Sequence, residues 1–289
     1  MNMTVNDGID LSAVRYVALC SRNEGGDFES AIGHHGHDVS VDYRTAVGMG
    51  NVEGHSLFRG FGYRTGLSTA VNGDDIWQGT ATTLPFPDQS VGEQMTFVST
   101  SAADSAAGAN IRTLHHHYLD SNGNEQVEVI TMNGVTPVNT VATNIRFSQY
   151  IHSNSVGAFG AVAAGDISVY RTGDAARVYN VIKAGGNISL NSMRMVPLNK
   201  KFFVDYISVT GASGKPLSVR LRATNDDEGI LTSGIFLFNE IFSIQDSAAI
   251  VILSVPRKFP ALSIVKATAF SSQAGGECTI SYGGWLETE

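Results

Sequence analysis

The feature that most constrains how this chain can fold is the alternation of apolar and polar residues in several short segments. Leu217, Val219 and Leu221 alternate with Ser and Arg, and a similar run at residues 203–209 precedes them across a Gly- and Ser-containing turn at residues 211–216. A period of two residues is that of a β-strand, because successive side chains point to opposite faces of a sheet. The pattern therefore predicts a β-hairpin at this place.

A second hairpin is predicted from residues 111–118 and 126–132. The turn between them contains Asn122 and Gly123, two residue types that tolerate a positive φ. A further strand is predicted at residues 138–147. Short apolar runs separated by turn residues also occur at residues 235–238, 249–253, 261–267 and 278–286. This spacing is typical of sandwiches and jelly rolls, so we predict an all-β fold with two β-sandwich or jelly-roll-like modules.

Composition supports a β-rich protein with many turns and an uncharged surface. Charged residues make up only 16% of the 289 residues, so Ser, Thr, Asn, Gln and Gly must cover much of the surface. Glycine is frequent and proline scarce, which favours tight turns over disorder. The formal net charge is −8 and the basic residues cluster only as pairs, such as Lys200-Lys201 and Arg257-Lys258. We therefore expect neither a nucleic-acid partner nor a membrane partner.

The chain is long enough for two or three packed parts. We predict an N-terminal arm or small irregular docking module at residues 1–65, a β-sandwich at residues 66–172 and a second, jelly-roll-like β-sandwich at residues 173–289. The arm is predicted because the first 60 residues have weak periodicity and many Gly and His residues. Arms of this composition often become ordered against a neighbouring subunit.

The cysteines and the N-terminal residues carry few signals. Cys20 and Cys278 lie far apart in the sequence and neither has a partner at a metal-ligand spacing, so a disulfide framework is excluded and one long-range bond between them stays open. The first residues lack the basic flank and apolar run of a signal peptide, and no apolar stretch reaches the length needed to span a membrane. We expect synthesis and folding in a cytoplasm.

Three segments in predicted loops suggest metal ligands. His34, His35 and His37 form a dense cluster, and acidic turns occur at residues 72–75 and 225–229. The histidines lie where the sequence shows little sign of order, which favours a solvated loop over a zinc site. The acidic turns lack the ligand spacing of a calcium loop, and Asp and Asn are common in turns because their side chains bond to the nearby backbone. We predict no metal site in these segments.

A second histidine cluster lies inside a predicted strand. Alternation places His115 and His117 on one face and His116 on the other, so at most two of the three could share a metal ion. Paired surface histidines, or histidines that gather at a trimer axis, are the preferred interpretation. Their titration near neutral pH could then tune an interface.

Catalytic signatures are absent from the sequence. There is no Gly-x-Ser-x-Gly elbow, no phosphate-binding glycine-rich loop with Lys-Ser or Lys-Thr, and no His-Glu-x-x-His motif. Trp77 and Trp285 could stack on sugars if exposed, but aromatic residues of β-sheets more often fill a core or a sheet edge. We therefore predict no catalytic residues, no cofactor-binding residues and no metal ligands, and a protein that is not an enzyme.

Several segments taken together resemble virion structural proteins of tailed, often marine, bacteriophages. Those proteins carry a Trp after acidic residues, a Phe-Pro step, a Ser- and Asp-containing turn before Gly and Ala, a Leu-Asp to Leu-Asn-Gly-Thr hairpin and a Gly-x-Ile-x-Val strand. The matching segments are residues 74–77, 84–87, 97–104, 107–109, 118–138 and 165–169. The resemblance covers about residues 60–225 and not the two ends of the chain.

The resemblance implies a structural component of a virion that is made in the host cytoplasm. It would act as a capsid decoration protein or as a component of the tail or its fibre attachment. The low-charge surface agrees with this, because such proteins assemble as closed symmetric oligomers that bury their sheet edges. We expect a homo-oligomer, a trimer or a ring, that docks to capsid, portal or tail subunits.

Two other function classes remain open from the sequence. One is a carbohydrate- or receptor-binding module that uses Trp77 or Trp285. The other is a metal-dependent hydrolase built on the histidine clusters.

Overall fold

The computed structural model describes residues 20–22, 28–30, 43–87, 90–212, 214–224, 235–245 and 248–289. The chain divides into two units, residues 1–51 and residues 52–289. In the first unit, strand β1 (Cys20–Arg22) pairs antiparallel with β2 (Phe28–Ser30), and a six-residue helix, α1 (Tyr43–Gly48), follows. Among the described residues, no helix is long and apolar enough to cross a membrane.

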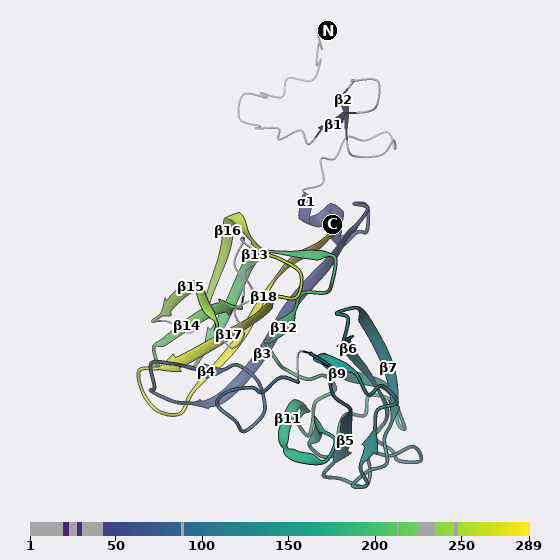
Figure 1. Ribbon diagram of the computed structural model, residues 1–289. Coiled ribbons are helices and arrows are strands. Elements are labelled where there is room, and N and C mark those ends of the chain that lie inside the picture. The colour runs from purple at the N-terminus through teal and green to yellow at the C-terminus, as the bar shows by residue number, and fades with distance from the viewer. Residues whose placement is uncertain are drawn as a thin grey trace, which may run out of the picture. The chain divides into compact units, whose positions relative to one another are not determined.

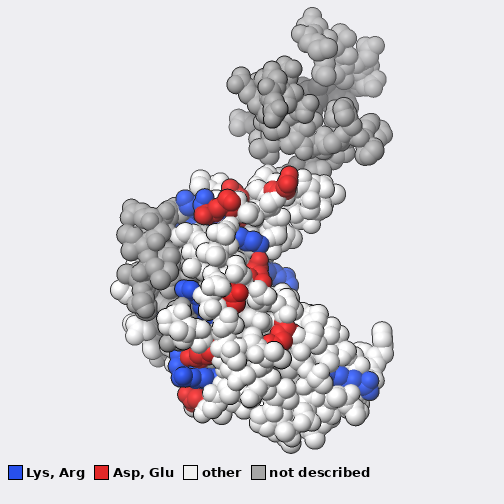
Figure 2. Space-filling model, turned by 45° about the vertical axis from the view of Figure 1, so that its right-hand side comes forward, with Lys and Arg blue, Asp and Glu red and all other residues white. Residues whose placement is uncertain are grey.

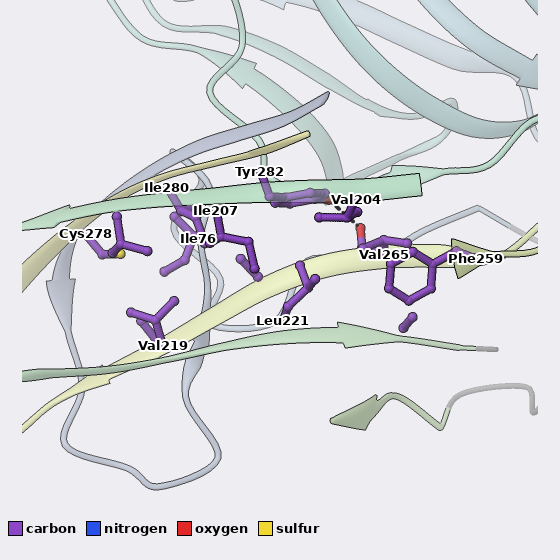
Figure 3. Packing of buried hydrophobic residues seen from close by; sticks show 14 of the residues in the cluster. Ile76, Val204, Ile207, Val219, Leu221, Phe259, Val265, Cys278, Ile280 and Tyr282 are labelled. Carbon is purple, nitrogen blue, oxygen red and sulfur yellow. Dashed lines mark hydrogen bonds between the residues drawn. The ribbon is translucent and has the colours of Figure 1, made fainter. Parts of the chain in front are cut away.

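Two sheets of the second unit share the largest apolar core. The first has the order β16-β13-β18-β3, and the second has the order β12-β17-β14-β15 with β4 paired to β17 (Figure 1). The strands are β3 (His55–Leu67), β4 (Asp74–Asp75), β12 (Arg194–Met195), β13 (Lys200–Gly211), β14 (Leu217–Ala223), β15 (Leu237–Ile244), β16 (Ala248–Phe259), β17 (Ile264–Ser271) and β18 (Gly276–Thr288). Side chains such as Ile207, Leu221 and Ile280 meet between the two sheets (Figure 3).

The other two sheets share a second core. Their orders are β11-β10-β5-β8 and β7-β6-β9. The strands are β5 (Met95–Ser99), β6 (Ile111–Asp120), β7 (Glu125–Thr131), β8 (Val138–Asn139), β9 (Ile145–Val156), β10 (Ile167–Arg171) and β11 (Asp174–Ile182). Phe97, Leu114 and Ile167 are fully buried in this core.

The prediction of an all-β fold is confirmed, but that of two separate sandwiches is confirmed only in part. The four sheets are arranged like the blades of a four-bladed propeller rather than as clear sandwiches. A third buried cluster gives the physical reason, because it joins the two pairs of sheets. It brings Trp77 together with Leu119 of β6, Val181 of β11 and Met195 of β12.

The hydrogen bonding does not follow the boundaries predicted at residues 65 and 172. Strand β3 crosses the first of them and pairs with β18, while the second falls in the turn between β10 and β11.

The sequence does not show the alternation expected of β3, because two of its core-facing residues are Gly60 and Gly62. A side chain at Gly60 would collide with the ring of Tyr282, and one at Gly62 with the carbonyl oxygen of Ile76.

Of the two predicted hairpins, one is confirmed and one is wrong. Strands β6 and β7 pair across a turn in which Gly123 has a φ of 89°. Strands β13 and β14 do not pair, because each lies inside a different sheet. The chain turns so that the apolar faces of β13 and β14 meet across the core, which removes both faces from water. The run predicted at residues 138–147 is divided between β8 and β9.

Candidate functional site

The sheet β7-β6-β9 brings three histidines together on one face. His115 and His117 lie two residues apart on β6, and His152 lies on β9 directly opposite His115. One ligand nitrogen from each of the three rings lies within 4.8 Å of the others. Nε2 of His117 and Nε2 of His152 are 3.1 Å apart. We call this group the histidine cluster.

The rings of the histidine cluster are held by their neighbours. His117 stacks on Tyr150 with ring centroids 4.3 Å apart, and the Arg194 guanidinium lies 5.3 Å from the centre of the Tyr150 ring. Nδ1 of His152 is 3.0 Å from the carbonyl oxygen of Ser153 and donates to it. Burial, and then the neighbouring His152 and His115, lower the pKa of His117 to about 4, so its imidazole is neutral at pH 7.

The predicted face assignment of the β6 histidines is confirmed. His116 points to the opposite side, where it is fully buried and its Nε2 lies 3.0 Å from Oγ of Ser148. Burial lowers the pKa of His116 to about 3. At most two of the three β6 histidines could share a metal ion, as predicted, and the neighbouring strand β9 supplies His152 as a third nitrogen ligand. His152 lies beyond the strand predicted at residues 138–147, and the sequence does not give the register that places it opposite His115.

Two of the other three segments that were considered as metal ligands lie outside the described residues. His34, His35 and His37 lie outside the described residues, and so does the acidic turn at residues 225–229. In the turn at residues 72–75, both carboxylates are buried and bond within the protein.

The two carboxylates at residues 74 and 75 have structural partners. Asp74 accepts hydrogen bonds from the backbone N–H and the hydroxyl of Ser68. Asp75 forms a buried ion pair with Lys266, with Oδ1 and Nζ 2.8 Å apart, and also accepts a bond from the N–H of Leu84. The structural interpretation of this turn is therefore supported by its contacts.

The two tryptophans have different environments. Trp77 is buried in the third apolar cluster and its Nε1 donates to the carbonyl oxygen of Ala81, so it cannot stack on a ligand at the surface. Trp285 lies half-buried on β18 and stacks on Phe203 of β13, with ring centroids 5.5 Å apart. It belongs to a larger apolar surface.

This second surface is the outward face of the sheet β16-β13-β18-β3. Phe203, Trp285 and Leu57 are neighbours across three strands, and Tyr206 lies opposite Ile252. Leu57, Ile250 and Ile252 are 61%, 74% and 63% exposed. We call the group the aromatic sheet face and define it as Leu57, Phe203, Tyr206, Ile250, Ile252 and Trp285.

A glycine shapes the aromatic sheet face. A Cβ at Gly283 would lie within 3.0 Å of the ring and hydroxyl of Tyr206, so only glycine lets this ring lie flat across β18. Such a face can be buried against a partner protein, whereas the histidine cluster offers nitrogen ligands.

Comparison of the chain with protein-family models and with curated proteins gives no match.

Proposed function

We propose that this protein is a non-enzymatic structural subunit that acts by self-association and by docking to other subunits. The observation that carries the proposal is the aromatic sheet face. Soluble monomers rarely expose large contiguous apolar patches, and aromatic residues are enriched at the centres of protein interfaces. Three aliphatic and three aromatic side chains on one sheet therefore favour an interface.

The surroundings of the aromatic sheet face are those of an interface rim. Arg59 lies opposite Gly283 on the same side of the sheet, and Lys258 lies opposite Phe203. Charged groups around an apolar centre are the usual arrangement of protein interfaces. The edge strand β16 carries Ile250 and Ile252, and an edge strand offers unpaired backbone groups to a second chain.

A virion of a tailed phage is the assembly that we propose, as a capsid decoration protein or as a tail or fibre-attachment component. The support is the resemblance described above, together with a surface that carries few charges. Figure 2 shows most of the visible surface as uncharged, with acidic and basic side chains in small scattered groups. The resembling segments also meet in space, since Asp104 binds the N–H of Gly165 and its carbonyl oxygen accepts from Gly134.

Light scattering of the full-length chain tests the proposal. We expect the wild type to form a defined homo-oligomer, and we expect the double variant Ile250→Lys/Ile252→Lys to be monomeric, because two ammonium groups cannot be buried without partners. Val141→Lys is the matched control, since Val141 is 88% exposed and lies outside the aromatic sheet face. It should leave the oligomer intact. A wild type that stays monomeric over the accessible concentration range would overturn the proposal.

A carbohydrate- or receptor-binding module is the second candidate, and the half-buried Trp285 on an outward face favours it. Binding on a glycan array that is lost in Trp285→Ala, by a protein that is monomeric, would favour this function over assembly.

A further inference from the structure

We propose that His115, His117 and His152 bind one divalent transition-metal ion, with Zn²⁺ as the fitting ion, through three imidazole nitrogens. Three protein ligands leave a fourth position of a tetrahedral ion for a water molecule. The site lies on the sheet β7-β6-β9, whereas the aromatic sheet face lies on the sheet β16-β13-β18-β3. The proposal is therefore independent of the proposed function.

The distance between the nitrogens fits a bound Zn²⁺ ion. Two nitrogens bound to a tetrahedral Zn²⁺ at about 2.0–2.1 Å lie ~3.3 Å apart. Nε2 of His117 and Nε2 of His152 are already 3.1 Å apart. The ligand nitrogen of His115 lies within 4.8 Å of both, so a rotation of its side chain completes the set. Paired strands hold all three Cα atoms in place, because His115 and His152 are directly opposite each other.

The hydrogen bonding of His152 leaves one ring nitrogen able to bind a metal ion. Its Nδ1 donates to the carbonyl oxygen of Ser153, which leaves the Nε2 lone pair directed at the cluster. Metal-binding histidines usually donate their other N–H in this way, and the bond orients the ring. With Nε2 of His152 bare, the 3.1 Å contact requires a proton on Nε2 of His117. A metal ion would take the place of that proton.

The charges around the cluster have opposing effects. Glu125 lies on the neighbouring strand β7 and favours a cation, although it also pairs with Lys200. Arg194 opposes a cation. Its Nη1 donates to the carbonyl oxygens of Gln149, Asn191 and Met193, and these dipoles offset part of its charge. Burial keeps His117 neutral at pH 7, which is the form that a metal ion requires.

The ligand types select the ion. Imidazole nitrogens suit Zn²⁺, Cu²⁺ and Ni²⁺, whereas Mg²⁺ and Ca²⁺ require oxygen ligands. The three ligands of the proposed site are all imidazoles. The site should therefore bind Zn²⁺ and not Ca²⁺.

Isothermal titration of the full-length chain with ZnCl₂ tests the proposal. The protein is purified without a histidine tag and stripped of metal with a chelator. Because His34, His35 and His37 could also bind zinc, all samples carry alanine at these three positions. We expect one Zn²⁺ per chain, no response to CaCl₂, and affinity lower by at least about 100-fold in His152→Ala and in His117→Ala.

The matched control is His55→Ala, since His55 lies on β3 outside the cluster and should leave zinc binding unchanged. Co²⁺ in place of Zn²⁺ should give the visible absorption of a tetrahedral site, and this band should be absent in His152→Ala. Circular dichroism establishes that each variant is folded, and His115→Asn replaces any variant that is not. Absence of zinc binding by the parent protein, or equal binding by the parent and the cluster variants, would overturn the proposal.

Discussion

Replacing Asp104 with alanine is expected to lower the free energy of unfolding by about 4 kcal/mol, as measured by urea denaturation. The Asp104 carboxylate is fully buried and accepts hydrogen bonds from the backbone N–H groups of Ile111, Ala164 and Gly165 and from the hydroxyl of Ser99. Alanine would leave these donors without an acceptor in a place that water does not reach. Each buried donor without a partner costs about 1–3 kcal/mol, and partial relaxation reduces the sum.

Two variants control this prediction. Asp104→Asn keeps one acceptor oxygen and should lose about 2 kcal/mol, since its NH₂ group faces N–H donors. Asp174→Ala removes an exposed carboxylate that accepts one bond from the N–H of Ala176, and should change stability by no more than about 0.5 kcal/mol. Equal losses in Asp104→Ala and Asp174→Ala would show that the buried network contributes nothing.

The second large effect is expected for Lys266→Met, which should cost about 3 kcal/mol in the same assay. The Lys266 ammonium and the Asp75 carboxylate are both buried, with Nζ 2.8 Å from Oδ1, and the ammonium also lies 4.2 Å from the centre of the Phe236 ring. Methionine preserves most of the volume. It leaves the Asp75 charge buried with the N–H of Leu84 as a remaining donor.

The double variant Asp75→Asn/Lys266→Met separates charge from packing. Because it removes both charges and keeps an acceptor for Leu84, it should recover most of the lost stability. Lys183→Met is the surface control, since Lys183 and Asp166 are 2.7 Å apart in a partly exposed pair. That variant should lose at most about 1 kcal/mol. A single variant Lys266→Met as stable as the wild type would contradict the argument.

Local sequence predicted those strands whose pairing depends on a short turn. In the β6–β7 hairpin, the Asp120 carboxylate accepts bonds from the N–H groups of Asn122 and Asn124, and Gly123 supplies the positive φ. All the required residues lie within a few positions of one another. For that reason the hairpin, its turn and the faces of His115 and His116 could be predicted from the sequence.

Longer-range choices could not be predicted in this way. Leu217, Val219 and Leu221 alternate equally well whether β14 pairs with β13 or faces it from another sheet, and the structure has the second arrangement. The strand β3 was missed because Gly60 and Gly62 replace the apolar residues that would reveal its core-facing side. The reason for glycine at these two positions is found only in the structure, where Tyr282 and Ile76 leave no room for a side chain.

The candidate site shows the same division. Alternation alone placed His115 and His117 on one face. His152 lies beside them because of the register between β6 and β9, and this register cannot be predicted from a single sequence. Asp104 was part of the segment that resembles phage virion proteins, yet its role as acceptor for two distant N–H groups, those of Ala164 and Gly165, depends on how separate loops meet.

The sequence by itself determined that the chain is β-rich, that its surface carries few charges and where its local turns lie. These properties follow from side-chain periodicity and composition, which act over a few residues. Only the tertiary structure decided which sheets share a core, that His152 joins His115 and His117, and that Trp285 rather than Trp77 reaches the surface. The physical reason is that a strand can bury its apolar face against any other strand of the chain. The period of two residues shows which face is buried but does not specify the strand that covers it.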